Sequence, residues 1–173
     1  NLVRRAITSG IPRDYTYLRP NKKYISSGLY LPSTLKEAID IAVMIDVSGS
    51  IGDKELADFL SEVIGISKAF SSQVKMRIMT HDTEIHTNEL VNGATKEKIL
   101  RVKIKGGGGT SFATPLKWIT ENAPKTKMLV WLTDGYGDDI KGIEKKCDII
   151  WVLNKGGSDN LLKNYGKVIQ IED

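Results

Sequence analysis

The chain has 173 residues, of which 40% are apolar and 27% charged, and its formal net charge is +4. This length allows one domain with a hydrophobic core and is too short for two ordinary domains. The composition is typical of globular proteins and unlike that of disordered chains. No apolar run approaches the roughly 20 residues that span a bilayer, and no signal peptide is recognisable within these residues. We therefore expect no interaction with a membrane.

The single cysteine, Cys147, excludes an internal disulfide and fits a reducing compartment, so we expect a cytoplasmic protein. The apolar run at 148–153 follows it directly, which favours a buried structural thiol over a reactive one. The lysines are scattered and interleaved with acidic residues. This pattern favours a solvated surface over a nucleic-acid groove, which needs clustered charge.

Residues 1–35 differ from the remainder, and we assign them as an N-terminal arm ahead of one domain at 36–173. The arm carries two dibasic pairs and three prolines without sustained periodicity. Its tyrosines, with Leu29, Leu31 and Leu35, are predicted to pack it on the domain. The alternative is an arm that contacts RNA or an acidic partner.

A buried strand and an amphipathic helix open the domain. Residues 39–45 are mostly apolar without alternation, as expected for a strand covered on both faces of a parallel sheet. The period then changes to that of a helix, which Gly52 or Asp53 caps and which runs to Phe70. Its apolar face is formed by Leu56, Phe59, Leu60, Val63, Ile64 and Phe70.

The middle of the chain predicts a hairpin and two further helices. Strands at 74–79 and 84–90 are joined by a connection too short for a helical crossover, so they pair antiparallel. A short helix at 95–100 precedes four glycines, 106–109, whose φ values we expect to be positive where the loop requires it. Thr114-Pro115 then opens another helix, with Phe112, Leu116 and Ile119 on its inner face.

The last third of the chain alternates strands with short helices. Strands are predicted at 128–132, 148–153 and 168–171, a helix at 140–146 and a helical turn at 161–165. Together the elements predict a doubly wound α/β fold. Its central sheet is mostly parallel with one antiparallel edge strand, and helices cover both faces.

Oxygen-bearing side chains gather where three loops meet the carboxyl edge of this sheet. Asp46, Ser48 and Ser50 follow the first strand, Thr110 follows the glycines, and Asp134 follows the strand at 128–132. Ligands bind at this edge in open α/β sheets. Oxygen side chains that converge on a tight loop are suited to a hard divalent cation such as Mg²⁺.

The order Asp-x-Ser-x-Ser, Gly-Thr and Thr-Asp-Gly resembles the metal-ion-dependent adhesion site (MIDAS) of von Willebrand factor type A (VWA) domains. The resemblance implies that Ser48, Ser50 and Thr110 bind Mg²⁺ or Mn²⁺ directly. Asp46 and Asp134 would then act largely through bound waters. Neutral hydroxyl ligands leave the cation short of negative charge, so it can recruit a carboxylate from another molecule.

Three further stretches resemble one subgroup, the VWA-like C-terminal domain of bacterial and phage proteins grouped with metallopeptidases. They are Gly28-Leu29-Tyr30-Leu31-Pro32-Ser33, His81-Asp82-Thr83-Glu84-Ile85-His86 and Gly106-Gly107-Gly108-Gly109-Thr110. The chain has no His-Glu-x-x-His motif, so any peptidase chemistry lies outside it.

We therefore expect a non-catalytic module that docks a protein partner presenting Asp or Glu. By analogy with other intracellular VWA proteins, we expect it to work beside a MoxR-type AAA+ ATPase or within a larger assembly. The alternatives are the accessory half of a metallopeptidase or a Mg²⁺-dependent phosphohydrolase. The phosphohydrolase is disfavoured because Ser48 stands where an Asp-x-Asp enzyme needs a second acid.

Three smaller features leave alternatives open. His81 and His86, with Asp82 and Glu84, suggest a zinc site, but their spacing on a tight hairpin favours ordinary hairpin residues. Asp138 and Asp139 either extend the acidic rim of the metal site or belong to a solvated loop. A phosphate-binding loop at 106–111 is excluded because the following Lys-Ser/Thr is missing.

Overall fold

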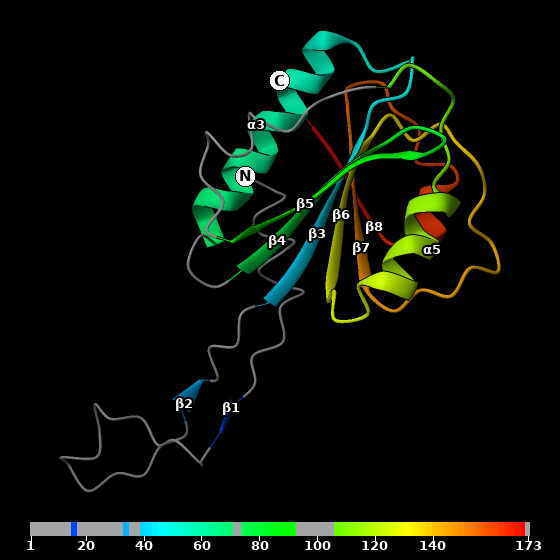
Figure 1. Ribbon diagram of the computed structural model, residues 1–173. Coiled ribbons are helices and arrows are strands. Elements are labelled where there is room, and N and C mark those ends of the chain that lie inside the picture. Colours follow the sequence, from blue (N-terminus) through cyan, green and yellow to red (C-terminus); the bar gives the residue numbers. More distant parts are fainter. Residues whose placement is uncertain (1–14, 17–32, 35–38, 71–73, 93–105, 172–173) are drawn as a thin grey trace, which may run out of the picture.

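The computed structural model describes residues 15–16, 33–34, 39–70, 74–92 and 106–171. Figure 1 shows a central sheet between two helices, α3 (Asp53–Phe70) and α5 (Ala113–Asn122). In the N-terminal part, β1 (Tyr15–Thr16) pairs antiparallel with β2 (Ser33–Thr34). The predicted packing of the arm and the predicted helix at 95–100 lie outside the described residues.

Six strands form the main sheet in the order β5-β4-β3-β6-β7-β8. The central strand β3 pairs parallel with both β4 and β6, whereas β5 pairs antiparallel with β4 at one edge. The bounds are β3 Ile39–Asp46, β4 Val74–His81, β5 Ile85–Asn92, β6 Met128–Thr133, β7 Asp148–Leu153 and β8 Lys167–Gln170. This topology confirms the predicted α/β class and its antiparallel edge.

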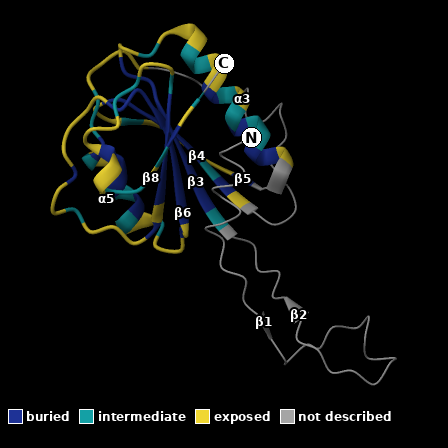
Figure 2. Ribbon diagram, turned by 180° about the vertical axis from the view of Figure 1, so that it is seen from behind, coloured by how far each residue is buried: buried dark blue, intermediate teal, exposed yellow. Residues whose placement is uncertain are grey.

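The core lies on both faces of the sheet, which explains the continuous apolar runs in the sequence. All six residues of β6 are buried, and β3 is buried from Ile41 onward (Figure 2). On one face α3 contributes Phe59, Val63 and Ile66 to the core. On the other face the buried residues come largely from α5, the even-numbered positions of β3, and the strands β6 and β7.

Helix α3 begins as the sequence predicts, directly after the Asp-Ser loop. The carbonyl of Gly52 accepts the N–H of Leu56 at 3.0 Å, which closes the first helical turn. Asp53 and Glu55 lie in this first turn, where the positive end of the helix dipole stabilises negatively charged side chains. The helix start therefore lies close to the loop that carries Ser48 and Ser50.

The predicted helix at 140–146 is wrong, because this segment forms a turn followed by chain without regular secondary structure. Gly142 has φ +81°, outside the right-handed helical region. The N–H of Ile143 donates to the carbonyl of Ile140, which is an i to i+3 turn bond. Ile140 is buried, so its apolar side chain anchors a turn and does not mark one face of a helix.

The tryptophans and the cysteine contribute to packing. Trp131 and Trp151 are fully buried and stack with their ring centroids 4.8 Å apart, whereas Trp118 is half-buried. Cys147 is buried, and desolvation, followed by the charge of Asp148, raises the pKa of its thiol to about 11. This confirms the prediction of a buried thiol. None of the helices in the described ranges is long and apolar enough to cross a bilayer.

Candidate metal centre

Asp46 is the most deeply buried of the five residues in the candidate site. It is the last residue of β3 and is completely inaccessible to solvent. Its Oδ1 accepts the backbone N–H of Ser48 at 2.9 Å, and its Oδ2 accepts the hydroxyl of Thr133 at 2.6 Å. Each oxygen therefore already accepts a protein hydrogen bond, which fits a carboxylate that orients its surroundings more than one that binds a cation directly.

Ser48 and Ser50 place two hydroxyl oxygens side by side. Their Oγ atoms lie 3.2 Å apart, with Ser48 buried and Ser50 exposed. Two neighbouring ligands of an octahedral Mg²⁺ at about 2.1 Å are separated by about 3.0 Å. The serine pair therefore has nearly the spacing and the donor chemistry that such an ion requires.

The glycine-rich loop is joined to the Asp-Ser loop by two backbone hydrogen bonds. The N–H of Gly107 donates to the carbonyl of Val47, and the N–H of Gly49 donates to the carbonyl of Gly108, both at 2.9 Å. A Cβ atom on Gly106 would lie 2.1 Å from the Val47 carbonyl oxygen. Close contact between the loops is thus a main reason for the glycines, and of the four only Gly107 has a positive φ. Thr110, half-buried, follows this contact.

Asp134 follows β6 and is buried at the same edge of the sheet. Its Oδ1 accepts the N–H of Tyr136 at 3.1 Å, and its carbonyl accepts the N–H of Ser158 at 2.8 Å. Gly135 between them has φ +81°, and a Cβ there would lie 2.0 Å from the Ser158 carbonyl. The Thr-Asp-Gly turn therefore depends on glycine for both its conformation and its packing.

The structure brings the loops of all five predicted ligands to one edge of the sheet. Some of these residues are linked directly by hydrogen bonds, and others only through their neighbours. Asp46, Ser48 and Ser50 are joined directly by hydrogen bonds. Thr110 is held through the glycine-rich loop, and Asp134 through its neighbour Thr133. Thr133 is part of the Thr-Asp-Gly motif but is not among the five residues predicted from the sequence. The signal for its role is a hydroxyl residue at the last position of a buried strand.

Asp82 holds the loop of Thr110 by hydrogen bonds to residues before and after Thr110 in the sequence. This residue, 5% exposed, accepts the Gly108 N–H on Oδ2 at 3.2 Å, and its carbonyl accepts the Ser111 N–H at 2.9 Å. Thr110 lies between these two anchored positions. Burial alone would raise the pKa of Asp82, but hydrogen bonds from the Glu84 N–H, His86 and Gly108 outweigh it and lower the pKa to about 2. The carboxylate is therefore ionised at neutral pH.

His81, completely buried, lies next to Asp46 in the sheet and has both ring nitrogens engaged. Its Nε2 lies 2.6 Å from Nε1 of Trp131, and its Nδ1 lies 3.2 Å from the Asp82 carbonyl. Since an indole N–H only donates, Nε2 must accept and Nδ1 carries the proton. Burial lowers the pKa of His81 despite the nearby charges of Asp46 and Asp82.

The zinc alternative on this hairpin is not supported. His86 pairs with Asp82 at 2.8 Å, while His81 points into the aromatic core against Trp131. Within the described ranges, no three His, Cys, Asp or Glu side chains are grouped so as to hold a metal ion. The candidate site at the sheet edge is not a group of this kind, because three of its five proposed donors are Ser or Thr hydroxyls.

Asp138 and Asp139 are exposed, as expected for a solvated loop, but each also accepts specific hydrogen bonds. Asp138 accepts the Ser111 hydroxyl at 2.8 Å and the Phe112 N–H at 2.6 Å, which caps the start of α5. Asp139 accepts the hydroxyl of Tyr165 at 2.6 Å, and this bond lowers the pKa of Asp139 and raises that of Tyr165.

Comparison with known sequences identifies one family and one relative. The family described as "VWA-like domain (DUF2201)" matches residues 41–172. An uncharacterized protein from Thermotoga maritima is 29% identical, in an alignment that covers 96% of this chain and 40% of that protein. The chain thus spans less than half the length of this relative.

Comparison with solved structures identifies the same architecture. VWA2, an ArnB paralog from Sulfolobus acidocaldarius, superposes with a TM-score of 0.62 at 16% identity over 79% of this chain and 42% of that chain. Proximal thread matrix protein 1 from the mussel byssus, in a structure with a zinc-occupied MIDAS motif, gives a TM-score of 0.63 at 18% identity over 78% and 44%. At these identities the likeness establishes the fold.

Proposed function

Since the chain belongs to the VWA-like domain family DUF2201, we propose that it is a non-catalytic, metal-dependent module that binds a protein partner. In this proposal, Ser48, Ser50 and Thr110 hold Mg²⁺ or Mn²⁺ through their hydroxyls. Asp46 and Asp134 orient the surrounding waters and balance the charge.

The serine pair beside Asp46 carries the proposal. Two neutral hydroxyl oxygens lie 3.2 Å apart, while each oxygen of the nearest carboxylate already accepts a protein hydrogen bond. A cation held by such donors receives little negative charge from the protein. The bound ion would supply a Lewis acid, and a carboxylate from a partner would complete its charge balance.

The choice of metal follows from the donors. The mussel protein provides an example of a MIDAS motif that holds zinc. Here the donors are all oxygens, and hard cations such as Mg²⁺ and Mn²⁺ prefer oxygen ligands. We therefore favour these two ions for this chain.

An exposed aromatic side chain beside the site supports a protein as the partner. Tyr136 is 60% exposed, and its N–H is bound to Asp134. Exposed tyrosines are enriched where proteins meet. We propose that Tyr136 packs on the chain that presents the Asp or Glu. A MoxR-type AAA+ ATPase in the cytoplasm remains our proposal for that partner, by analogy alone.

The second candidate function is that of an accessory domain in a longer metallopeptidase. The chain corresponds to 40% of its Thermotoga relative, so a longer protein of this kind has room for another domain. In that role the module would still bind a carboxylate. A phosphohydrolase is less favoured, since Ser48 offers a hydroxyl where a second acid is needed.

The test is a peptide array probed with the Mn²⁺-loaded chain, in which each peptide with Asp or Glu has a twin with Asn or Gln. We expect binding to acidic peptides only, its loss with EDTA, and weaker binding by Tyr136→Ala at unchanged Mn²⁺ affinity. Equal binding to both twins would contradict the proposal. So would metal-dependent hydrolysis of p-nitrophenyl phosphate that Ser48→Ala abolishes.

A further inference from the structure

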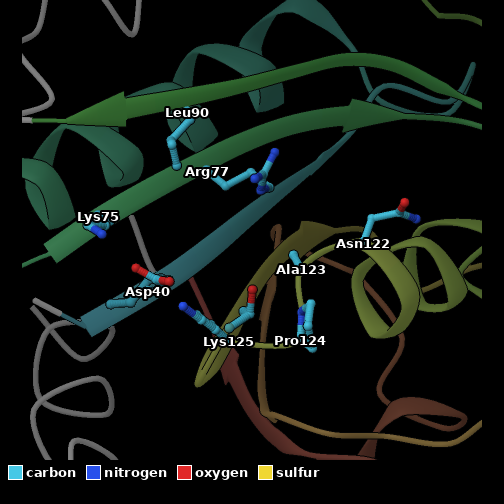
Figure 3. A pocket seen from close by; sticks show the side chains of 10 residues that line it. Asp40, Lys75, Arg77, Leu90, Asn122, Ala123, Pro124 and Lys125 are labelled. Atoms are coloured by element: carbon cyan, nitrogen blue, oxygen red, sulfur yellow. The ribbon is translucent and has the colours of Figure 1, made fainter.

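A groove of about 300 Å³ lies at the edge of the sheet opposite to the candidate metal site (Figure 3). It borders the start of β3, the outer strands β4 and β5, and the chain that follows α5. Its walls are formed by Asp40, Ile41, Lys75, Arg77, Leu90, Asn122, Ala123, Pro124, Lys125 and Thr126.

The groove exists because α5 covers only part of its face of the sheet. The helix packs Leu116 and Ile119 with core residues of β3, β6 and β7. The outer strands continue past it, and Leu90 on β5 is 55% exposed, directly opposite Arg77 on β4. Since β5 is reached by a short hairpin, no crossover helix between β4 and β5 covers this part of the face.

The charges that line the groove are unbalanced. Three cationic side chains, Lys75, Arg77 and Lys125, face one carboxylate, Asp40, which leaves a surplus of two positive charges. Arg77 is held in place because one of its Nη atoms donates to Oδ1 of Asn88 at 2.5 Å and its guanidinium lies 5.2 Å from the ring of Trp118. A guanidinium has five N–H donors, so this bond leaves capacity for an anion.

Asp40 supplies an independent observation. Its Oδ1 is buried and, among the residues that the structure describes, has no hydrogen-bond partner. A carboxylate with one oxygen in this state has its negative charge only partly compensated by the protein. A ligand cation that binds at the groove side of Asp40 would compensate this charge.

We propose that this groove binds a small carboxylic acid that also carries an ammonium group, such as an acidic amino acid. Its carboxylates would pair with Arg77 and the flanking lysines, and its ammonium group would donate to Asp40. The volume is at the lower end of the range for small-molecule sites, which fits a ligand of this size.

L-aspartate and succinate provide a matched pair of probes, since they differ only in the ammonium group. The experiment is an ¹⁵N NMR titration of the full chain without metal, so that the Asp46 site does not compete. The indole N–H of Trp118 reports on Arg77, and the buried Trp131 and Trp151 are internal references. We expect L-aspartate to shift the Trp118 signal and to bind about tenfold more tightly than succinate, as one charge-assisted hydrogen bond between its ammonium group and the Asp40 carboxylate implies.

Three variants decide the outcome. Asp40→Asn should bring the two affinities to within about twofold, because the amide offers the ammonium no charge. Lys125→Met should weaken both probes, whereas Lys163→Met, outside the groove, should weaken neither. An unmoved Trp118 signal overturns the proposal, as does an equal affinity for the two probes in the unmodified chain. A preference for L-aspartate that survives Asp40→Asn overturns it as well.

Discussion

The hydroxyl of Thr133 donates a 2.6 Å hydrogen bond to Oδ2 of Asp46, across 87 positions of sequence. Both residues are completely buried, and they end the neighbouring parallel strands β6 and β3. The bond therefore joins the Asp-Ser loop to the Thr-Asp-Gly turn beneath the surface. It sets the distance between two of the three loops that we assign to the metal site.

Removal of this hydroxyl should destabilise the fold. Thr133→Val keeps the shape of the side chain but takes the donor from Asp46, so we expect the free energy of unfolding to fall by about 1–3 kcal/mol. Urea denaturation provides the measurement. Thr114→Val is the matched control, since the Thr114 side chain is exposed, and it should change the stability by less than about 0.5 kcal/mol. Equal losses for the two variants would contradict the buried role of Thr133.

The glycine-rich loop should tolerate a methyl group at one end and reject it at the other. A Cβ on Gly106 would lie 2.1 Å from the Val47 carbonyl, whereas one on Gly109 would be 3.6 Å from its nearest neighbour, in Thr83. Gly106→Ala should therefore cost about 3 kcal/mol or more through overpacking, and Gly109→Ala should cost less than about 1 kcal/mol. Thermal unfolding of both variants measures this difference, and a larger loss for Gly109→Ala would refute the close contact of the loops.

Asp82 should contribute a pH-dependent stability. Its folded pKa of about 2 lies below the ordinary value of 3.8, so the ionised carboxylate stabilises the fold above about pH 4. This contribution, about 2 kcal/mol, is lost as the pH falls from about 4 towards 2.

Comparison of the unmodified chain with Asp82→Asn isolates this contribution. The difference between their free energies of unfolding should be largest at neutral pH and should shrink as the pH is lowered to about 3. The amide proton of Gly108, which donates to the Asp82 carboxylate, should also exchange faster in the variant. Asp58→Asn on the exposed face of α3 is the control for the loss of one charge. A difference between the chain and Asp82→Asn that stays constant with pH would contradict this assignment.

His81 should be neutral at neutral pH with its proton on Nδ1. The indole N–H of Trp131 lies 2.6 Å from Nε2 and can only donate, which leaves Nδ1 to donate to the Asp82 carbonyl. Nitrogen-15 NMR distinguishes the two tautomers directly. A proton found on Nε2 would show that the hydrogen bond from Trp131 does not form.

Much of the fold could be predicted because its signals are local. The continuous apolar runs of β3 and β6, and the helical period that starts at Asp53, each follow from burial. The turn at 140–146 could not be predicted from periodicity. There, Gly142 adopts a left-handed conformation in a segment whose apolar spacing resembles a helix.

The candidate site was predictable only in its motif residues. Asp-x-Ser-x-Ser and Thr-Asp-Gly identify side chains that we assign to the proposed ion. The roles of Thr133, Asp82 and Asp138 depend on partners between 26 and 87 positions away, which a single sequence does not reveal. The glycines illustrate the same limit, since their close approach to Val47 becomes evident only in the folded chain.

The central claim is that the serine hydroxyls beside Asp46 bind a divalent cation. The most direct measurement is a calorimetric titration with Mn²⁺ of the unmodified chain and of Ser48→Ala, with Ser61→Ala as the control. Ser61 lies on α3, where its hydroxyl bonds to the Ala57 carbonyl, so it makes the same chemical change away from the site. We expect measurable binding to the chain and to Ser61→Ala, and at least a tenfold loss of affinity, about 1.4 kcal/mol, in Ser48→Ala. Equal Mn²⁺ affinity in all three proteins, or none in any, would contradict the assignment.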